Sequence, residues 1–253
     1  RMGVSLRGYD ICIYPLTHQK CYDNVWGKID KVHSISNDLL KVAKEDGLSA
    51  KKPCHIITPA INLTYFNNNP RIWKKPKTIK FLTLSRLHWK KGLEHTLSAL
   101  SMLYKEGTQF RYKIVGEGPE RERLIYAAHQ LGIDKIVEFV GSVSHEETKR
   151  YYENADIYLQ YSIQEGYSNS ALEAQAMGLI TIVSDAEGLP ENIKNKNWIV
   201  QKNNPVALAK KIKSICEDKE EKINRMIINA LHTVEKENNV ENQIKEFLGF
   251  YEQ

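Results

Sequence analysis

From Lys80 onward, short apolar runs alternate with longer segments of helical periodicity. The short runs are residues 81–84, 112–115, 136–140, 157–161 and 179–183, with residues 198–200 as a candidate sixth. Between them, apolar side chains recur three or four residues apart, as the buried face of a helix requires. Strands that alternate with helices form βαβ units, in which each crossover helix leads to another parallel strand. The pattern predicts an α/β fold with a Rossmann-like, doubly wound parallel sheet.

Local signals mark where several of the helices begin. Ser144 and Glu147 form a capping box, in which the two side chains satisfy opposite N–H groups of a helix's first turn. A helix is therefore expected from residue 145 to about residue 154. Further helical patterns begin at Pro205 and fill residues 219–236 and 240–251.

The signals before Lys80 are weaker. Residues 10–14 are strand-like, and we expect a strand near residues 31–35, a helix over 37–46 and a strand at 55–57. The Asn-Asn-Asn-Pro at 67–70 and the Lys-Lys-Pro at 74–76 are typical of a linker or an exposed loop. A strand-like run this early predicts that the chain begins in the middle of a domain.

The composition is that of a globular protein with a sizeable core, since 42% of the 253 residues are hydrophobic and 26% are charged. No run approaches the ~18 consecutive apolar residues of a membrane-spanning helix, and the N-terminus lacks the features of a secretory signal. A cytoplasmic location is expected, and a place at the inner face of the membrane stays open. The four cysteines lie far apart without histidines at metal-ligand spacing, which predicts reduced thiols and no metal site.

The net charge is +5, and lysines gather over residues 74–80, at 90–91 and over 194–213. A solvated basic face would explain these clusters, and a surface for anionic lipid or phosphorylated ligands is the alternative. Peripheral association with a membrane therefore stays open. Aromatic residues are not interleaved with the lysines as a nucleic-acid surface would require, so no nucleic-acid partner is expected.

The sharpest motif is a pair of glutamates, Glu165 and Glu173, that bracket a loop-to-helix transition just after a strand. The segment between them begins Gly166-Tyr167-Ser168-Asn169-Ser170. Glycine lets the backbone approach a ligand, Asn169 or Ser170 is expected to cap the helix, and the free N–H groups of its first turn favour a phosphate. Ligands of open α/β sheets bind at this carboxyl edge, where the two carboxylates can accept hydrogen bonds from sugar hydroxyls.

A second motif is Ser-Arg-Leu-His-Trp-Lys-Lys-Gly over residues 85–92, directly after the first strand of the large sheet. It places Arg86 and Lys91 at the same edge, where both could pair with a diphosphate. The Gly116-Glu117-Gly118 that follows invites a dinucleotide-binding interpretation, but Arg121 stands where the third glycine of that motif is required. These glycines therefore predict a tight turn and not a dehydrogenase.

Together with Glu187-Gly188-Leu189-Pro190-Glu191, these segments resemble the large family-four retaining glycosyltransferases of the GT-B fold, over roughly residues 32–200. The resemblance implies a partial acceptor-side domain and crossover over residues 1–62, and a C-terminal nucleotide-sugar-binding Rossmann-like domain over 63–239. Residues 240–253 would be a helix that packs either on the first domain or within the second. A complete member has two domains of ~150 residues each, so part of the acceptor domain would be missing.

The same resemblance implies roles for the motif residues. Arg86 and Lys91 would stabilise the leaving diphosphate and Glu165 would bind a hydroxyl of the donor sugar, which makes these three the candidate catalytic residues. Glu173 would hold the nucleotide ribose. The remaining donor-binding positions would be Gly166, Tyr167, Ser168, Asn169, Ser170, Gly116, Val140 and Gly141. The donor would be a nucleotide-diphosphate sugar and the acceptor a saccharide or a lipid-linked molecule, with retained anomeric configuration and neither metal nor cofactor.

Two segments depart from the pattern of that family. Residues 5–10 resemble its H-G-x-D segment with Arg7 in the place of the histidine, so Arg7 could contact phosphate or acceptor. Residues 59–62, Pro-Ala-Ile-Asn, replace its P-N-G-[VI]-D near the crossover. The leading hypothesis is a sugar transferase of surface polysaccharide or lipopolysaccharide synthesis. A non-catalytic nucleotide-sugar-binding module or subunit and a nucleotide-sugar epimerase are the alternatives.

Overall fold

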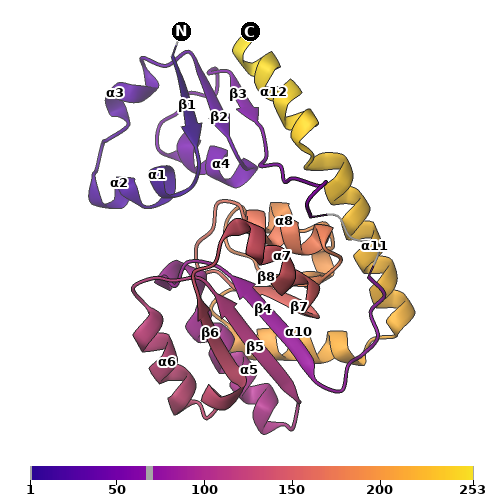
Figure 1. Cartoon of the computed structure of the whole chain (residues 1–253). Coiled ribbons are helices and arrows are strands. Elements are labelled where there is room, and N and C mark those ends of the chain that lie inside the picture. The colour runs from indigo at the N-terminus through magenta and orange to yellow at the C-terminus, as the bar shows by residue number, and fades with distance from the viewer. Residues whose placement is uncertain (1, 67–70, 253) are drawn as a thin grey trace.

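The computed structural model describes residues 2–66 and 71–252, where the chain forms two parallel sheets (Figure 1). The small sheet has the order β1-β2-β3 and the large one the order β6-β5-β4-β7-β8-β9. The strands are β1 (Gly3–Leu6), β2 (Lys31–Ser34), β3 (Cys54–Ile56), β4 (Ile79–Leu84), β5 (Phe110–Val115), β6 (Val137–Gly141), β7 (Ile157–Gln160), β8 (Ile180–Ser184) and β9 (Ile199–Val200). The predicted α/β class with Rossmann-like parallel sheets is confirmed. The Asn-rich segment 67–70, expected as a linker, lies outside the described residues.

The strand order of the large sheet reverses between β4 and β7. The chain moves outward from β4 to β5 and β6, returns to the centre at β7, and then moves outward on the other side through β8 to β9. In a doubly wound sheet the loops after the two central strands diverge, which leaves a crevice at their carboxyl ends. This is where the two motifs after β4 and β7 meet.

Helices connect the strands and cover the sheets. Those that accompany the small sheet are α1 (Tyr9–Cys12), α2 (Tyr14–Thr17), α3 (Asp23–Trp26) and α4 (Asn37–Glu45). Those that follow are α5 (Leu93–Lys105), α6 (Arg121–Gln130), α7 (His145–Glu153), α8 (Asn169–Ala176), α9 (Leu189–Asn192), α10 (Pro205–Glu217), α11 (Glu220–Glu237) and α12 (Val240–Glu252). The capping box that begins α7 is confirmed, because Ser144 Oγ accepts from Glu147 N and the Glu147 carboxylate accepts from Ser144 N.

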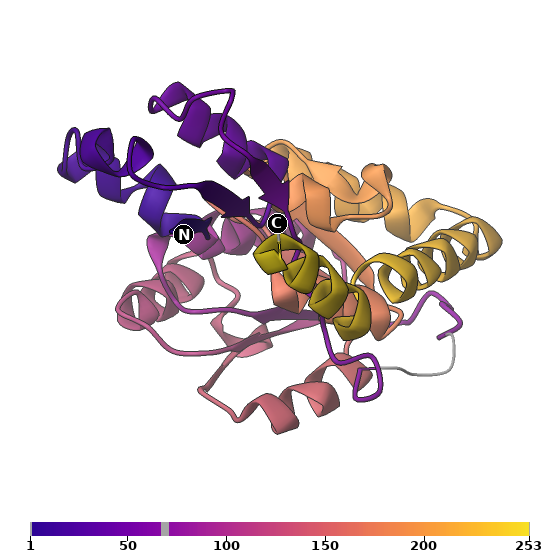
Figure 2. The same cartoon turned by 90° about the horizontal axis from the view of Figure 1, so that it is seen from above.

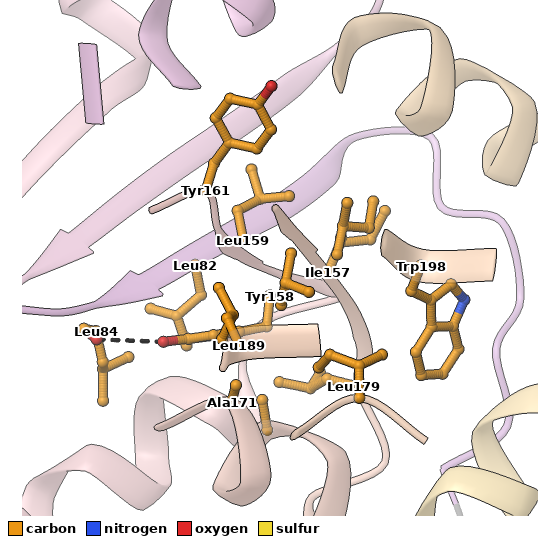
Figure 3. Close-up of a cluster of buried hydrophobic side chains, with 14 of the residues drawn as sticks. Leu82, Leu84, Ile157, Tyr158, Leu159, Tyr161, Ala171, Leu179, Leu189 and Trp198 are labelled. Atoms are coloured by element: carbon orange, nitrogen blue, oxygen red, sulfur yellow. Dashed lines mark hydrogen bonds between the residues drawn. The ribbon is translucent and has the colours of Figure 1, made fainter. Parts of the chain in front are cut away.

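The centre of the large sheet is a continuous hydrophobic core (Figure 3). Every residue of β7 and β8 is buried, since helices cover both faces of these strands. Tyr158 stands among these side chains, and its hydroxyl donates to the carbonyl oxygen of Leu84 at 3.2 Å, the dashed line in Figure 3. This hydrogen bond from the Tyr158 hydroxyl fixes the ends of β4 and β7 relative to each other. Each of these two strands is followed by a loop that carries candidate site residues.

The prediction of a strand over residues 10–14 is wrong. Those residues form α1 and the beginning of α2, and the first strand is instead β1. Gly8 has φ of 124°, and its carbonyl oxygen accepts from the backbone of Ile11 and Cys12 at 3.3 and 2.8 Å. The Asp10 carboxylate accepts from Arg7 N at 3.0 Å. A glycine turn and an acidic first helical turn thus outweigh the strand preference of the isoleucines, of which only Ile11 is buried.

The two C-terminal helices run along one side of both sheets (Figures 1 and 2). α11 packs on α8 of the large sheet, and α12 then reaches the small sheet, where Phe247 and Phe250 meet the ring of His33 edge-on. The side chain of Lys31 donates to the carbonyl oxygen of Phe250. Within residues 2–66 and 71–252, no helix combines the length and the apolar character needed to cross a membrane.

Candidate active site

The loops after β4 and β7 join their candidate residues through an ion pair between Lys91 and Glu165. The two side chains are 17% and 13% exposed, so the pair lies largely out of solvent. Oε2 of Glu165 also accepts from the side chains of Gln160 at 3.2 Å and Ser162 at 3.4 Å. All three donors converge on one oxygen, which leaves Oε1 of Glu165 without a partner among the described residues.

A glycine sets the path of the loop that carries Lys91. Gly92 follows the short 3₁₀ turn Trp89–Lys91 and has φ of 58°, in the left-handed region. A Cβ at this position would lie 2.1 Å from the carbonyl oxygen of Tyr161. Only glycine lets the turn approach the end of β7 so closely, and this approach brings the ammonium group of Lys91 to Glu165.

Arg86 is exposed at the same edge and forms no ion pair with any described carboxylate. Lys90 lies between the two sheets, with its ammonium 4.5 Å from the ring centre of Tyr9. Burial lowers the pKa of Lys90, and the neighbouring Arg86 charge lowers it further. The loop therefore presents a concentration of positive charge that the single carboxylate of Glu165 only partly neutralises, which favours an anionic ligand.

Glu173 is buried in α8, and each of its carboxylate oxygens has a partner on α7. The Tyr152 hydroxyl donates to Oε2 at 2.8 Å, and Nε2 of His145 lies 3.1 Å from Oε1. Burial raises the pKa of Tyr152 well above its ordinary value and the Glu173 charge adds to this, so the phenol stays a neutral donor. His145 is 68% exposed and forms the open side of this cluster.

Sequence reasoning did not find Tyr152 and His145. They are seven residues apart, so they share one face of α7, and such spacing on a helix next to a motif carboxylate could have indicated them.

The N-cap of α8 lies earlier in the chain than either residue expected to cap the helix. Ser168 is the N-cap and accepts from Ala171 N at 3.3 Å, so the prediction of Asn169 or Ser170 as the cap is wrong. Ser168 has the extended backbone that a cap requires, whereas Asn169 is already helical. The hydroxyl of Ser170 instead lies 2.8 Å from the Tyr158 hydroxyl.

The other residues of the loop between β7 and α8 face different parts of the structure. The Tyr167 side chain points to the end of α11, where its hydroxyl accepts from the side chain of Asn238, the C-cap of that helix, at 3.2 Å. Gly166 lies against the small-sheet side, where an added Cβ would be 3.1 Å from the carbonyl oxygen of Arg7. Asn169 and Arg7 line a common cavity of about 220 Å³ between the two sheets.

The remaining donor-binding candidates lie at the ends of the neighbouring strands. Gly116 follows β5 and donates from its backbone N to the carbonyl oxygen of Gly141 at 2.8 Å. Val140 and Gly141 end β6, and both are half-buried. Each therefore lies at the carboxyl edge of the large sheet.

Glu191 connects the two sheets at the mouth of the cleft. Its carboxylate accepts from the backbone N of Asn37 at 2.9 Å, from the Asn37 side-chain amide at 2.9 Å and from Asp38 N at 3.0 Å. It therefore caps α4 from the other side of the cleft. The nearby Gly188 permits this close approach, because a Cβ there would be 2.7 Å from the hydroxyl oxygen of Ser36, the N-cap of α4.

Two parallel Rossmann-like sheets that face each other across a cleft, with candidate residues at the carboxyl edge of one, define the GT-B class. The chain superposes on a crystal structure of Anabaena Alr3699/HepE in complex with UDP at a TM-score of 0.85 and 17% identity, covering 100% of this chain and 72% of that one. It superposes on sucrose-phosphate synthase from Thermosynechococcus elongatus at a TM-score of 0.82 and 21% identity, covering 97% of this chain and 64% of the other.

The chain belongs to the family Glycosyl transferases group 1, whose model matches residues 66–233. It is 31% identical over 161 residues to WcaL of Escherichia coli (strain K12), a glycosyltransferase assigned by name to colanic acid biosynthesis, covering 60% of this chain and 39% of that protein. It is 33% identical over 139 residues to the amylovoran biosynthesis glycosyltransferase AmsK of Erwinia amylovora, covering 52% of this chain and 34% of that protein. The chain thus spans two fifths or less of the length of these relatives.

Proposed function

We propose that this chain is the donor-binding half, with part of the acceptor half, of a glycosyltransferase. The protein would move a sugar from a nucleotide-diphosphate sugar to a saccharide or lipid-linked acceptor in surface polysaccharide or lipopolysaccharide synthesis. The observation that carries the proposal is the ion pair of Lys91 with Glu165, which joins the loop after β4 to the loop that leads into α8. Arg86 is exposed on the same loop as Lys91. The names of WcaL and AmsK support the polysaccharide role, and the UDP bound in HepE supports a nucleotide donor.

Each part of the donor would have a partner of matching chemistry. The diphosphate would lie among Arg86, Lys91 and the free N–H groups of α8, because cations and a helix N-terminus both favour a phosphate. The ribose hydroxyls would donate to Glu173, whose orientation Tyr152 fixes. The base would lie along Val140 and Gly141.

Transfer would then be electrostatic in character and would retain the anomeric configuration. As the bond to the sugar breaks, negative charge grows on the diphosphate, and the two cations stabilise it without help from a metal ion or another cofactor. Lys91 would also hold Glu165 through Oε2, so that Oε1 remains able to accept from a donor-sugar hydroxyl. A cytoplasmic location, at the inner face of the membrane for a lipid-linked acceptor, is part of this proposal.

The test is the thermal stabilisation of the chain by UDP, GDP, ADP and CMP and by their sugar conjugates, because a ligand that binds only the folded state raises the melting temperature. We expect one base to be preferred, and we expect Glu173→Gln to reduce the shift while leaving the melting temperature without ligand nearly unchanged. If no nucleotide stabilises the folded chain, donor binding by these residues is refuted. Binding without sugar transfer by a protein with both complete domains would favour the non-catalytic module.

A further inference from the structure

A groove of about 490 Å³ lies between one face of the large sheet and α7, away from the cleft. Four cations line it: Lys80 on β4, Arg111 and Lys113 on β5, and Arg150 on α7. Among the described residues that line this basic groove, none is an aspartate or a glutamate. The alternation in β5 explains the open face, because Phe110, Tyr112 and Ile114 point to the covered side and the two cations to the other.

The register of the sheet places like charges directly opposite each other. Lys80 pairs with Arg111 across neighbouring strands, with both side chains on the open face. Like charges in this position destabilise a sheet. Neither residue forms an ion pair with a described carboxylate, and the Arg111 guanidinium donates to the neutral carbonyl oxygen of Lys135 at 2.7 Å. An anion bound between them would relieve this repulsion.

The other two cations of the groove are only partly compensated. Lys113 lies 2.9 Å from Glu138, and Arg150 lies 3.2 Å from Glu147, with all four side chains about half exposed. Exposed pairs of this kind are weak, so a ligand carboxylate or phosphate can compete for the cations. Two carboxylates for four cations leave the groove with an excess of positive charge.

The α7 wall adds groups suited to a sugar. The half-buried Tyr151 supplies an aromatic surface, and Asn154 supplies an amide whose nitrogen donates to the Arg150 carbonyl oxygen at 2.7 Å. A membrane surface would instead require protruding apolar side chains. The exposed apolar residues Ile125 and Tyr126 lie on α6, outside this groove.

We infer that the basic groove binds a saccharide that carries carboxylate or phosphate groups. The site is separate from the proposed donor site. Lys80 is the second residue of β4 and Arg86 follows that strand's end, which separates them by roughly 20 Å at ~3.3 Å per residue. The inference therefore goes beyond sugar transfer and does not depend on nucleotide binding. An anionic oligosaccharide held here would contact the protein at a distance from the cleft.

The test is calorimetric titration of the whole chain at low ionic strength with trigalacturonate, glucose 6-phosphate, inorganic phosphate, neutral maltotriose and oligothymidylate. Two double variants each remove two positive charges: Lys80→Gln with Arg111→Gln in the groove, and Lys105→Gln with Lys210→Gln on α5 and α10. All four side chains are exposed. If the first variant loses its fold, Lys113→Gln with Arg150→Gln takes its place. UDP binding is measured on every variant.

We expect at least one of the two anionic saccharides to bind. The groove variant should weaken that binding about tenfold or more, as the loss of charge-assisted hydrogen bonds predicts, while the α5–α10 variant should leave it unchanged. UDP binding should be the same in both variants, which separates this result from the donor site. The inference is overturned if neither anionic saccharide binds or if both variants weaken binding equally. It is also overturned if inorganic phosphate or oligothymidylate binds as tightly as the saccharides.

Discussion

The hydroxyl of Tyr152 lies 2.8 Å from Oε2 of Glu173, and both side chains are buried. When a buried carboxylate oxygen loses its hydrogen-bond donor, its desolvation is no longer compensated, and this destabilises the fold by about 1–3 kcal/mol. Tyr152 therefore determines where Glu173 presents its lone pairs, although it does not itself line the cleft edge.

Replacement Tyr152→Phe removes this hydroxyl, which also lies 3.1 Å from the carbonyl oxygen of Ser170, and keeps the buried ring. We expect the free energy of unfolding to fall by about 1–3 kcal/mol, and UDP affinity to fall roughly fivefold because Glu173 is less well oriented. Urea denaturation and calorimetric titration measure the two effects. Tyr126→Phe on α6, where the side chain is 63% exposed, is the matched control. Unchanged values in both experiments would show that the hydrogen bond has no such role.

Replacement Lys91→Ala should weaken UDP binding about tenfold, because it removes a cation from the proposed diphosphate site. UMP affinity should fall less, since it has one phosphate. The dependence of UDP affinity on salt concentration should also become shallower. Titrations at several salt concentrations test this, with the exposed Lys105→Ala as control. An equal loss for UDP and UMP would contradict a contact with the diphosphate.

Replacement Glu191→Ala should loosen the contact between the two sheets. The carboxylate accepts three hydrogen bonds at the N-terminus of α4, where a negative charge also interacts favourably with the helix dipole. We expect the free energy of unfolding to fall by about 0.5–1 kcal/mol. We also expect faster amide hydrogen exchange in the first turn of α4. Glu217→Ala at the end of α10 serves as control, and exchange rates equal to those of the native chain would rule out the contact in solution.

His33 should make the fold less stable in acid. Burial lowers its pKa below the usual 6.5, and the charges of Arg7 and His55 lower it further. The neutral ring fits its site, where Nδ1 lies 2.8 Å from Ser5 Oγ and Nε2 lies 3.0 Å from the Ile57 carbonyl oxygen. The unfolded chain therefore binds a proton at this ring more readily than the folded chain does. The neutral ring contributes its full stabilisation above about pH 6.5, and the free energy of unfolding decreases as the pH falls from there through the lower pKa of the folded state.

Chemical denaturation between neutral and mildly acidic pH measures this loss. His33→Gln should flatten the dependence on pH, because the variant has no ring to protonate. A proton titration of the ring by NMR with a midpoint at or above 6.5 would contradict the prediction.

The order of strands and helices in the large sheet could be predicted because the signals are local. A run such as residues 179–183 is apolar whatever it packs against, and the capping box of Ser144 and Glu147 is complete within four residues. The secondary structure of the first 60 residues is less easily predicted from the sequence. The run at 10–14 has the side chains of a strand, but the turn at Gly8 and the position of Asp10 decide for a helix.

Periodicity and the motifs that follow strands were enough to predict the α/β class, the parallel arrangement of the large sheet and a position near one edge for Arg86, Lys91, Glu165 and Glu173. Which of these groups meet depends on the packing of the folded chain. Lys91 pairs with Glu165, Tyr152 and His145 hold Glu173, and Glu191 caps α4 from the far side of the cleft. Such contacts join residues as much as 154 positions apart. They depend on the order of the strands in the sheet and on the paths of the loops in space, neither of which can be predicted from residue spacing along the chain.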